Sequence, residues 1–578
     1  MKKNRRVISA AVCVLLIAAM LIPMLSAASV GSTAWAEEST VLYQNDVFTK
    51  RLYKTVAKIG FGSDGSMIVD DRQTIRKVYG LLAGMRLKAK NNTKKNTENE
   101  KKAAAVAVVL YKKDGSKKTY TFTGDLMRTG KKTYTIKKNN PAGEIREIFE
   151  TRSSGAVVKA KYPKVAQYPN EADYTNANGE IDYDAYSKAH DLWWKDAKSR
   201  RELTGYADGL DRFLTDSTKQ FLSEAKSENR IYSPLNVYMA LGMLAELTDG
   251  SSRQQILDLL GSSDIQSLRR QASALWNANY INDGLTTSIL AGSVWLDKDI
   301  DYHSSALETL AQTYYASAYQ GEMGSDELNH QLQEWLNEQT GGLLEQQASE
   351  IELNPETVLA LATTIYFRAK WHDEFYEANT KENTFHTPAG DVNCEFMNKE
   401  KSYGVYYWGD SFSAVSQSLE GTGSMWFLLP EEGVSVDELL SDAQAMDFLL
   451  SQDRNEWKDR KNAWVNLSVP KFDVSSMFGL KDGLQALGVT DVFHAQTSDF
   501  SPMTSDLDGL SVTRADHAAR VAIDEKGVTA AAFTVIGVDA AGAPLSDEEV
   551  DFVLDRPFLF AVTGTDGMPL FVGVVNQP

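Results

Sequence analysis

The stretch DEKGVTAAAFTVIGVDAAGAPLSDEE, residues 524–549, has the pattern with the clearest chemical consequence in this chain. From Gly527 to Val538 it contains no charge and no proline, and it then continues into the small residues DAAGAP. A central β-strand tolerates neither an unpaired buried ion nor a missing backbone donor, so this segment is suited to become one. Every second residue from Val528 is apolar or a small hydroxyl, and we assign this set to the core side. Composition alone favours an ordinary buried strand.

Motifs of catalytic chemistry do not occur in the sequence. It contains no G-x-S-x-G, no H-E-x-x-H and no cluster of cysteines and histidines, and its seven histidines are scattered. We therefore expect a protein that is not an enzyme and that needs no cofactor and no metal ion.

The N-terminus has the features of a secretory signal. Four basic residues precede the apolar run Val7–Leu25, and Ala34-Trp35-Ala36 offers small residues for cleavage. We expect residues 1–36 to be a signal peptide and the mature chain to be secreted. The alternative is an uncleaved anchor, because the apolar run could nearly span a bilayer. Removal of the signal would leave Cys394 as the one cysteine, so no disulfide framework is expected.

Charge divides the 578-residue chain into two differently built parts. Residues 41–165 contain 28 Lys and Arg against 11 Asp and Glu, whereas the residues beyond 165 contain 28 against 65. A chain of this length is too long for one ordinary core, and we expect at least two domains.

Residues 41–160 are predicted to form a small basic α+β module. A helix should start near Arg72, several alternating strands should follow, and residues 88–102 should form a solvated loop. The excess of lysine could attract an anionic polymer at a cell surface, or it could be a solvated face. We expect no nucleic acid partner, because the basic residues are not interleaved with aromatic residues. Residues 161–204 should be a linker and a helical extension that contains Trp193 and Trp194.

From residue 205 to the C-terminus the sequence resembles the serpin family. The resemblance covers about 370 residues and rests on the order and spacing of several segments. They are NRIYSPLNVYMALGMLAE (229–246), TTIYFRAKWHDEF (363–375), FLLPEEG (427–433), VPKFDVSSMFGLKDGLQALGVTDVFHAQTSDFSPMT (469–504), DHAARVAIDEKGVTAAAF (516–533) and DRPFLFAVTGTDGMPLFVGVVNQP (555–578).

The resemblance implies an α+β serpin domain of three β-sheets and about nine helices with an exposed reactive loop, over residues 205–578. Its central sheet would accept the loop as an additional strand, so the native state would be metastable. The implied function is inhibition of a serine protease, and we expect a monomer. The alternative is a serpin-fold binding or carrier protein that traps no protease and is attached through its basic module.

The resemblance also assigns the parts of the loop. The hinge would comprise Glu525, Gly527, Val528, Thr529, Ala530, Ala531 and Ala532. Thr529 stands where the family often has an acidic residue, and Phe533 stands where a small one is usual. Counting from the hinge places the reactive bond at Ala541-Gly542, whereas counting back from Pro557 places it near Ser546. The alanines around residue 541 suit the shallow pocket of an elastase-like or subtilisin-like protease.

Two supporting groups are implied by the same matches. Ser233, Asn236, Thr363 and His517 would form a buried polar cluster that controls separation of the central strands. The amide of Asn236 and the hydroxyl of Thr363 stand exchanged relative to the usual family pattern, which would preserve donors and acceptors. Trp371 would lie where the loop first inserts, and Lys471 would form an ion pair with Glu525.

Overall fold

The computed structural model describes residues 11–18, 45–62, 67–69, 72–90, 106–153, 156–176, 180–201, 207–225, 227–340, 348–349, 351–528 and 548–578. Contacts divide the chain into two compact units. The large unit comprises Met1–Ser26 and Val158–Pro578, and the small unit comprises Ala27–Val157. Across these described ranges, no helix is both long and apolar enough to cross a membrane.

The small unit is a seven-stranded sheet with helices on one face. The order of its strands is β3-β2-β5-β6-β7-β8-β4. Its elements are α1 (Lys50–Tyr53), β2 (Val56–Gly62), β3 (Met67–Val69), α2 (Arg72–Ala83), β4 (Arg86–Lys90), β5 (Val106–Lys112), β6 (Lys117–Thr123), β7 (Leu126–Thr129), β8 (Lys132–Lys138) and α3 (Ala142–Ser153). The helix expected near Arg72 is therefore present.

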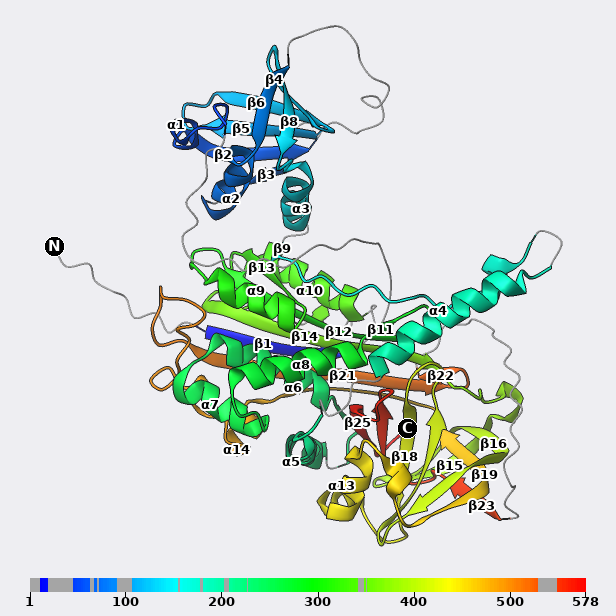
Figure 1. Ribbon diagram of the computed structural model, residues 1–578. Coiled ribbons are helices and arrows are strands. Elements are labelled where there is room, and N and C mark those ends of the chain that lie inside the picture. The colour runs from blue at the N-terminus through cyan, green and yellow to red at the C-terminus, as the bar shows by residue number, and fades with distance from the viewer. Residues whose placement is uncertain are drawn as a thin grey trace. The chain divides into compact units, whose positions relative to one another are not determined.

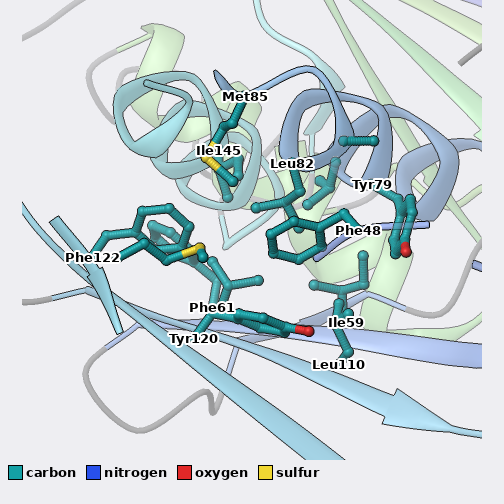
Figure 2. Close-up of a cluster of buried hydrophobic side chains, with 14 of the residues drawn as sticks. Phe48, Ile59, Phe61, Tyr79, Leu82, Met85, Leu110, Tyr120, Phe122 and Ile145 are labelled. Carbon is teal, nitrogen blue, oxygen red and sulfur yellow. The ribbon is translucent and has the colours of Figure 1, made fainter. Parts of the chain in front are cut away.

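The core of the small unit is built around Phe48 (Figure 2). The ring centroid of Phe48 lies 4.5 Å from that of Tyr120 and 5.9 Å from that of Tyr79. Leu82 of α2 and Ile145 of α3 are fully buried in the same cluster. One face of the sheet is thus covered by helices, and every second residue of each strand points into this core.

The expected loop 88–102 of the small unit is wrong for its first three residues. Residues 88–90 of the predicted loop 88–102 belong to β4, where Lys88 pairs with Thr135 of β8. A lysine-rich strand can form at the edge of a sheet, because it needs only one hydrogen-bonded neighbour and its charged side chains stay in water. Residues 91–102 of the predicted loop lie outside the described residues.

The large unit contains the expected helices. Nine α-helices lie within the described part of residues 205–578. They are α5 (Asp211–Leu222), α6 (Pro234–Leu247), α7 (Gly250–Leu259), α8 (Ile265–Asn279), α9 (Ser304–Thr313), α10 (Asp326–Thr340), α12 (Val436–Ser441), α13 (Ala443–Leu450) and α14 (Lys481–Ala486). The preceding helix α4 (Tyr183–Arg201) buries Trp193, whose Nε1 donates to Asp283 Oδ2 at 2.8 Å, while Trp194 is half-exposed.

The central sheet has nine strands and the path β1-β21-β22-β14-β12-β13-β9 (Figure 1). β11 pairs with β12, β20 pairs with β21, and β1 also pairs with β14. The bounds are β1 (Ala11–Ala18), β9 (Ala156–Val158), β11 (Ile281–Asn282), β12 (Thr287–Asp297), β13 (Ala316–Gly321), β14 (Thr357–Lys370), β20 (Phe472–Gly479), β21 (Ser511–Asp524) and β22 (Gly527–Val528). β14 is buried along nearly its whole length, as expected of a strand in the middle of a sheet.

A second sheet of nine strands provides the other layers. Its path is β10-β25-β24-β18-β17-β16-β19-β23, and β15 pairs with β16. The bounds are β10 (Arg230–Tyr232), β15 (Lys381–Thr387), β16 (Gly390–Trp408), β17 (Phe412–Ser418), β18 (Ser424–Pro430), β19 (Arg460–Pro470), β23 (Glu549–Val553), β24 (Phe558–Thr563) and β25 (Pro569–Val575). The register of β16 against β19 shifts between Lys399 and Ser402. A bulge of this kind bends a strand, and the long β16 here joins two of the three expected sheets into one ladder.

The separate core of the small unit generates a prediction. Phe48→Ala should lower the stability of the small unit by about 3–5 kcal/mol, because it removes a buried ring and leaves a cavity. Calorimetry of the whole chain should show one transition moved to lower temperature and the other unchanged. Leu192→Ala removes an exposed side chain and serves as the control. A shift of both transitions by Phe48→Ala would contradict the separation of the cores.

Candidate functional site

The slot between β14 and β21 is the centre of the candidate site. β1 lies in this slot and runs parallel to both strands (Figure 1). Leu16 is the register partner of Thr363 on β14 and also of His517 on β21. The apolar segment predicted to be part of a secretory signal is therefore a strand of the central sheet while it remains attached.

The first residues of the predicted hinge occupy the other end of the slot. β22 is antiparallel to both neighbours, with Val528 opposite Ala369 of β14 and Ile523 of β21. Val528 is fully buried, on the parity assigned to the core. A Cβ at Gly527 would lie 2.3 Å from the carbonyl oxygen of Ala369, so only glycine permits this approach.

A tight turn before Gly527 directs the chain into the slot. Asp524 Oδ1 accepts hydrogen bonds from the backbone N–H groups of Lys526 (2.8 Å) and Gly527 (3.1 Å). The Trp371 indole N–H donates to the Asp524 carbonyl at 2.7 Å, and the Phe375 N–H donates to the Glu525 carbonyl at 3.0 Å. Trp371 is 2% exposed, so this anchor is shielded from water.

The Glu525 carboxylate binds two side chains beside the turn. Its Oε1 accepts a hydrogen bond from Thr380 Oγ1 at 2.7 Å and lies 3.2 Å from Lys471 Nζ. Burial alone would raise the pKa of Glu525, but these two partners hold it below its usual value. Lys471 also pairs with Glu395 at 3.1 Å. The arrangement keeps Glu525 ionised and the turn closed.

The structure brings the four residues of the predicted polar cluster together. The Ser233 N–H donates to His517 Nε2 at 3.1 Å, and Ser233 Oγ donates to the Leu570 carbonyl at 2.7 Å. Ser233 also caps α6 by accepting from the Asn236 N–H, and Asn236 Nδ2 donates to the Thr363 carbonyl at 3.4 Å. Within the described part of the chain, Thr363 Oγ1 and His517 Nδ1 are buried without a hydrogen-bond partner.

His517 is uncharged in the folded protein. Complete burial, with a smaller contribution from the positive charge of Arg230, lowers the pKa of His517 to about 3. Acceptance of the Ser233 N–H at Nε2 requires an unprotonated Nε2, which agrees with this shift. The rings of Tyr232 and Phe478 lie against the imidazole, with centroids 5.5 and 5.3 Å away.

Much of the predicted loop lies outside the described residues. This applies to Thr529, Ala530, Ala531, Ala532 and the bond Ala541-Gly542.

Sequence reasoning missed three contributors that hold the hinge, namely Asp524, Phe375 and Thr380. The spacing of Asp524 and Gly527 could have indicated the turn, because Asp side chains cap backbone N–H groups two and three residues on. Thr380 gives no such signal, because its distance in sequence from Glu525 hides the contact.

Comparison with known proteins points to one family. Residues 208–578 match the family described as Serpin (serine protease inhibitor). Serpin-ZX of Arabidopsis thaliana is 29% identical over 370 residues, which cover 61% of this chain and 93% of that protein. The plasma serine protease inhibitor of Mus musculus is 29% identical over 371 residues, covering 62% of this chain and 87% of that protein.

Solved structures of the same fold cover the same part of the chain. The native state of tengpin, a thermophilic serpin, has a TM-score of 0.56 at 25% identity, over 64% of this chain and 93% of that one. Human thyroxine-binding globulin has a TM-score of 0.56 at 20% identity, over 65% of this chain and 100% of that one. At that identity the second match shows the shared fold alone.

The buried His517 generates a pH prediction. The folded state leaves His517 unprotonated down to about pH 3, whereas the unfolded chain binds this proton below about pH 6.5. Unfolding therefore takes up a proton at mildly acidic pH, and stability falls as pH falls. At pH 5 the proton taken up by His517 on unfolding lowers the free energy of unfolding by about 2 kcal/mol.

His517→Gln keeps an acceptor for Ser233 and cannot take up this proton. Denaturant unfolding at pH 7.5 and pH 5 should show a smaller loss of stability in His517→Gln than in the unaltered chain. His494→Gln changes an exposed histidine and should behave like the unaltered chain. Equal losses in all three proteins would contradict the assigned cause.

Proposed function

Because the chain belongs to the serpin family, whose members generally inhibit serine proteases, we propose that it is a secreted inhibitor that traps its target. The single observation that carries this proposal is the position of β22, since the loop already begins as a strand of the central sheet. Continuing the same register would bring Thr529 opposite Arg368 and Ala530 opposite Phe367. Each further residue inserted would satisfy backbone groups of both neighbouring strands.

The trapping step follows from acyl-transfer chemistry. The serine hydroxyl of the protease attacks the carbonyl carbon of Ala541, and the amine of Gly542 leaves with a proton. The ester that remains links the protease to the freed end of the loop. Inhibition requires that the loop insert before water hydrolyses this ester. The alanines around residue 541 favour an elastase-like or subtilisin-like target, since no Lys or Arg lies between Lys526 and Arg556.

A carrier or binding protein with the same fold is the competing function. Two features of the sequence favour it, namely Thr529 in the hinge and the bulky Phe533 on the inserting segment. Such a protein would be cleaved in its loop without forming an adduct, which makes the two functions distinguishable in one experiment.

Covalent adduct formation tests trapping directly. The mature chain incubated with an elastase-like or subtilisin-like protease should give a denaturant-stable band at the summed mass of both proteins. Ala530→Arg places a charge on the inward parity and should convert the inhibitor into a cleaved substrate. Thr529→Arg adds the same charge on the outward parity and should still trap. If both variants still form the adduct, the assignment of Ala530 to the core side is refuted. Cleavage of the unaltered chain without an adduct would favour the carrier.

The attached leader should prevent trapping. If the β22–β14 register continued, residues 529–533 would pair with residues 368–364 of β14. The next residue of β14 is Thr363, which already pairs with β1. Loop insertion beyond that point requires β1 to leave. We expect a chain that retains residues 1–36 to be cleaved with little adduct, and a chain that begins at Glu37 to trap. The ratio of adduct to cleaved inhibitor measures the difference.

Leu15→Pro provides the control for this leader effect. Proline removes a backbone donor that a central strand needs, so the leader should leave the slot although it stays attached. This variant should trap like the shortened chain. Equal adduct yields from the full and shortened chains would show that β1 does not compete with the loop.

A further inference from the structure

The sheet of the small unit has a second face that its core does not use. Side chains of β6, β7, β8 and β4 alternate, and Tyr120, Phe122, Met127 and Ile136 point into the core around Phe48. The residues between them lie on the opposite face. Hereafter the threonine–lysine face means the polar residues at these positions on the four strands: Lys88, Lys90, Lys117, Thr119, Thr121, Thr123, Arg128, Thr133, Thr135 and Lys137. Leu126 of β7 is the one apolar residue at these positions, and it is buried.

The strand register arranges these residues in rows across the sheet. One row is Thr121, Arg128, Thr133 and Lys90, each the register partner of the next. The adjacent row is Thr123, Leu126, Thr135 and Lys88. Cations two residues apart on a strand are about 7 Å apart, and cations two strands apart are about 10 Å apart. Threonine hydroxyls, which can both donate and accept, lie between them.

Carboxylates are excluded from all seven strands of this sheet. The strands carry eleven Lys and Arg and no Asp or Glu. The two carboxylates in the turns that flank β6 are held locally. Asp114 accepts from Ser116, and Asp125 accepts from Asn140. The positive charge of the face is therefore not neutralised by the strands themselves.

Solubility does not account for a basic surface on this chain. The residues beyond 165 carry 65 acidic against 28 basic residues, and the whole chain has a net charge of -18. A chain with that excess is already kept apart from its copies by charge. The small unit has the opposite sign, so it attracts a class of partner that the large unit repels.

We propose that the threonine–lysine face binds a linear phosphodiester polymer of the polyol type outside the cell. The face has four lysines to one arginine, and repeated ammonium groups act as point charges that suit phosphates spaced along a flexible chain. The threonines offer hydrogen bonds to phosphate and polyol oxygens. Among the described strands, Tyr111 of β5, the register partner of Lys117, is the one aromatic residue on this face of the sheet. A single ring cannot stack successive bases, so a nucleic acid lacks most of the contacts that hold it on such platforms. This binding is independent of the protease trapping proposed above.

Binding of poly(glycerol phosphate) to the mature chain tests the proposal. The face variant combines Lys88→Gln, Lys117→Gln, Arg128→Gln and Lys137→Gln. The matched control combines Arg51→Gln, Lys54→Gln, Lys77→Gln and Arg146→Gln, which are exposed and lie on α1, α2, α3 or the turn after α1. Both variants change the net charge by the same amount. Circular dichroism and the thermal transition of each variant establish that the small unit is folded.

The face variant should bind at least about tenfold more weakly, since each cation near an anionic partner contributes about fivefold. Its slope of log affinity against log salt should be smaller by about three than that of the unaltered chain. The control should lose less than about threefold. Equal losses in both variants, equal binding of polyuronate or poly(dT), or no binding at low salt would each overturn the proposal.

Discussion

Every backbone N–H and C=O in the middle of a sheet needs a partner, and the large unit is organised around the two strands for which this requirement is hardest to meet. β14 is bonded to β12 on one edge and β21 to β20 on one edge, and their other edges face the slot. The strands are parallel, so neither can fold back on the other through a short turn. Whatever enters the slot gains two ladders of hydrogen bonds at once. That gain is the force on which the proposed trapping by loop insertion depends.

Two segments of the same chain satisfy parts of this slot. β1 bonds to both edges from the end that includes Thr357 and Ser511, and β22 bonds to both from the opposite end. Their directions differ, since β1 is parallel to its neighbours and β22 is antiparallel. The polar cluster lies where β1 passes, because Thr363 and His517 have the same register partner, Leu16. Removal of the leader would therefore free the part of the slot that the loop occupies last in the proposed insertion.

The turn at Asp524 determines that β22 begins at Gly527. Asp524, Trp371 and Phe375 hold its backbone, and Thr380 and Lys471 hold the carboxylate of Glu525. Individually such partly exposed ion pairs contribute little energy. Their effect is geometric, because they hold Gly527 so close to the carbonyl of Ala369 that a side chain at this position would collide with it. The small unit has its own core and a charge of opposite sign.

Local patterns in the sequence determined the helices, the alternating strands and the boundary of charge, and they also predict an insertable segment after Gly527. These depend on periodicity and composition over short windows, and the resemblance to a family then related distant segments such as Ser233 and His517. Other features could not be predicted because they join residues far apart in the chain. Thr380 binds Glu525 across 145 positions, and the register that aligns Thr121, Arg128, Thr133 and Lys90 exists only when four strands assemble. The apolar run at residues 7–25 has the composition of a signal, and composition does not distinguish a leader from a strand. Only the tertiary structure, in which the edges of β14 and β21 face each other across the slot, decided that part of this run completes a sheet.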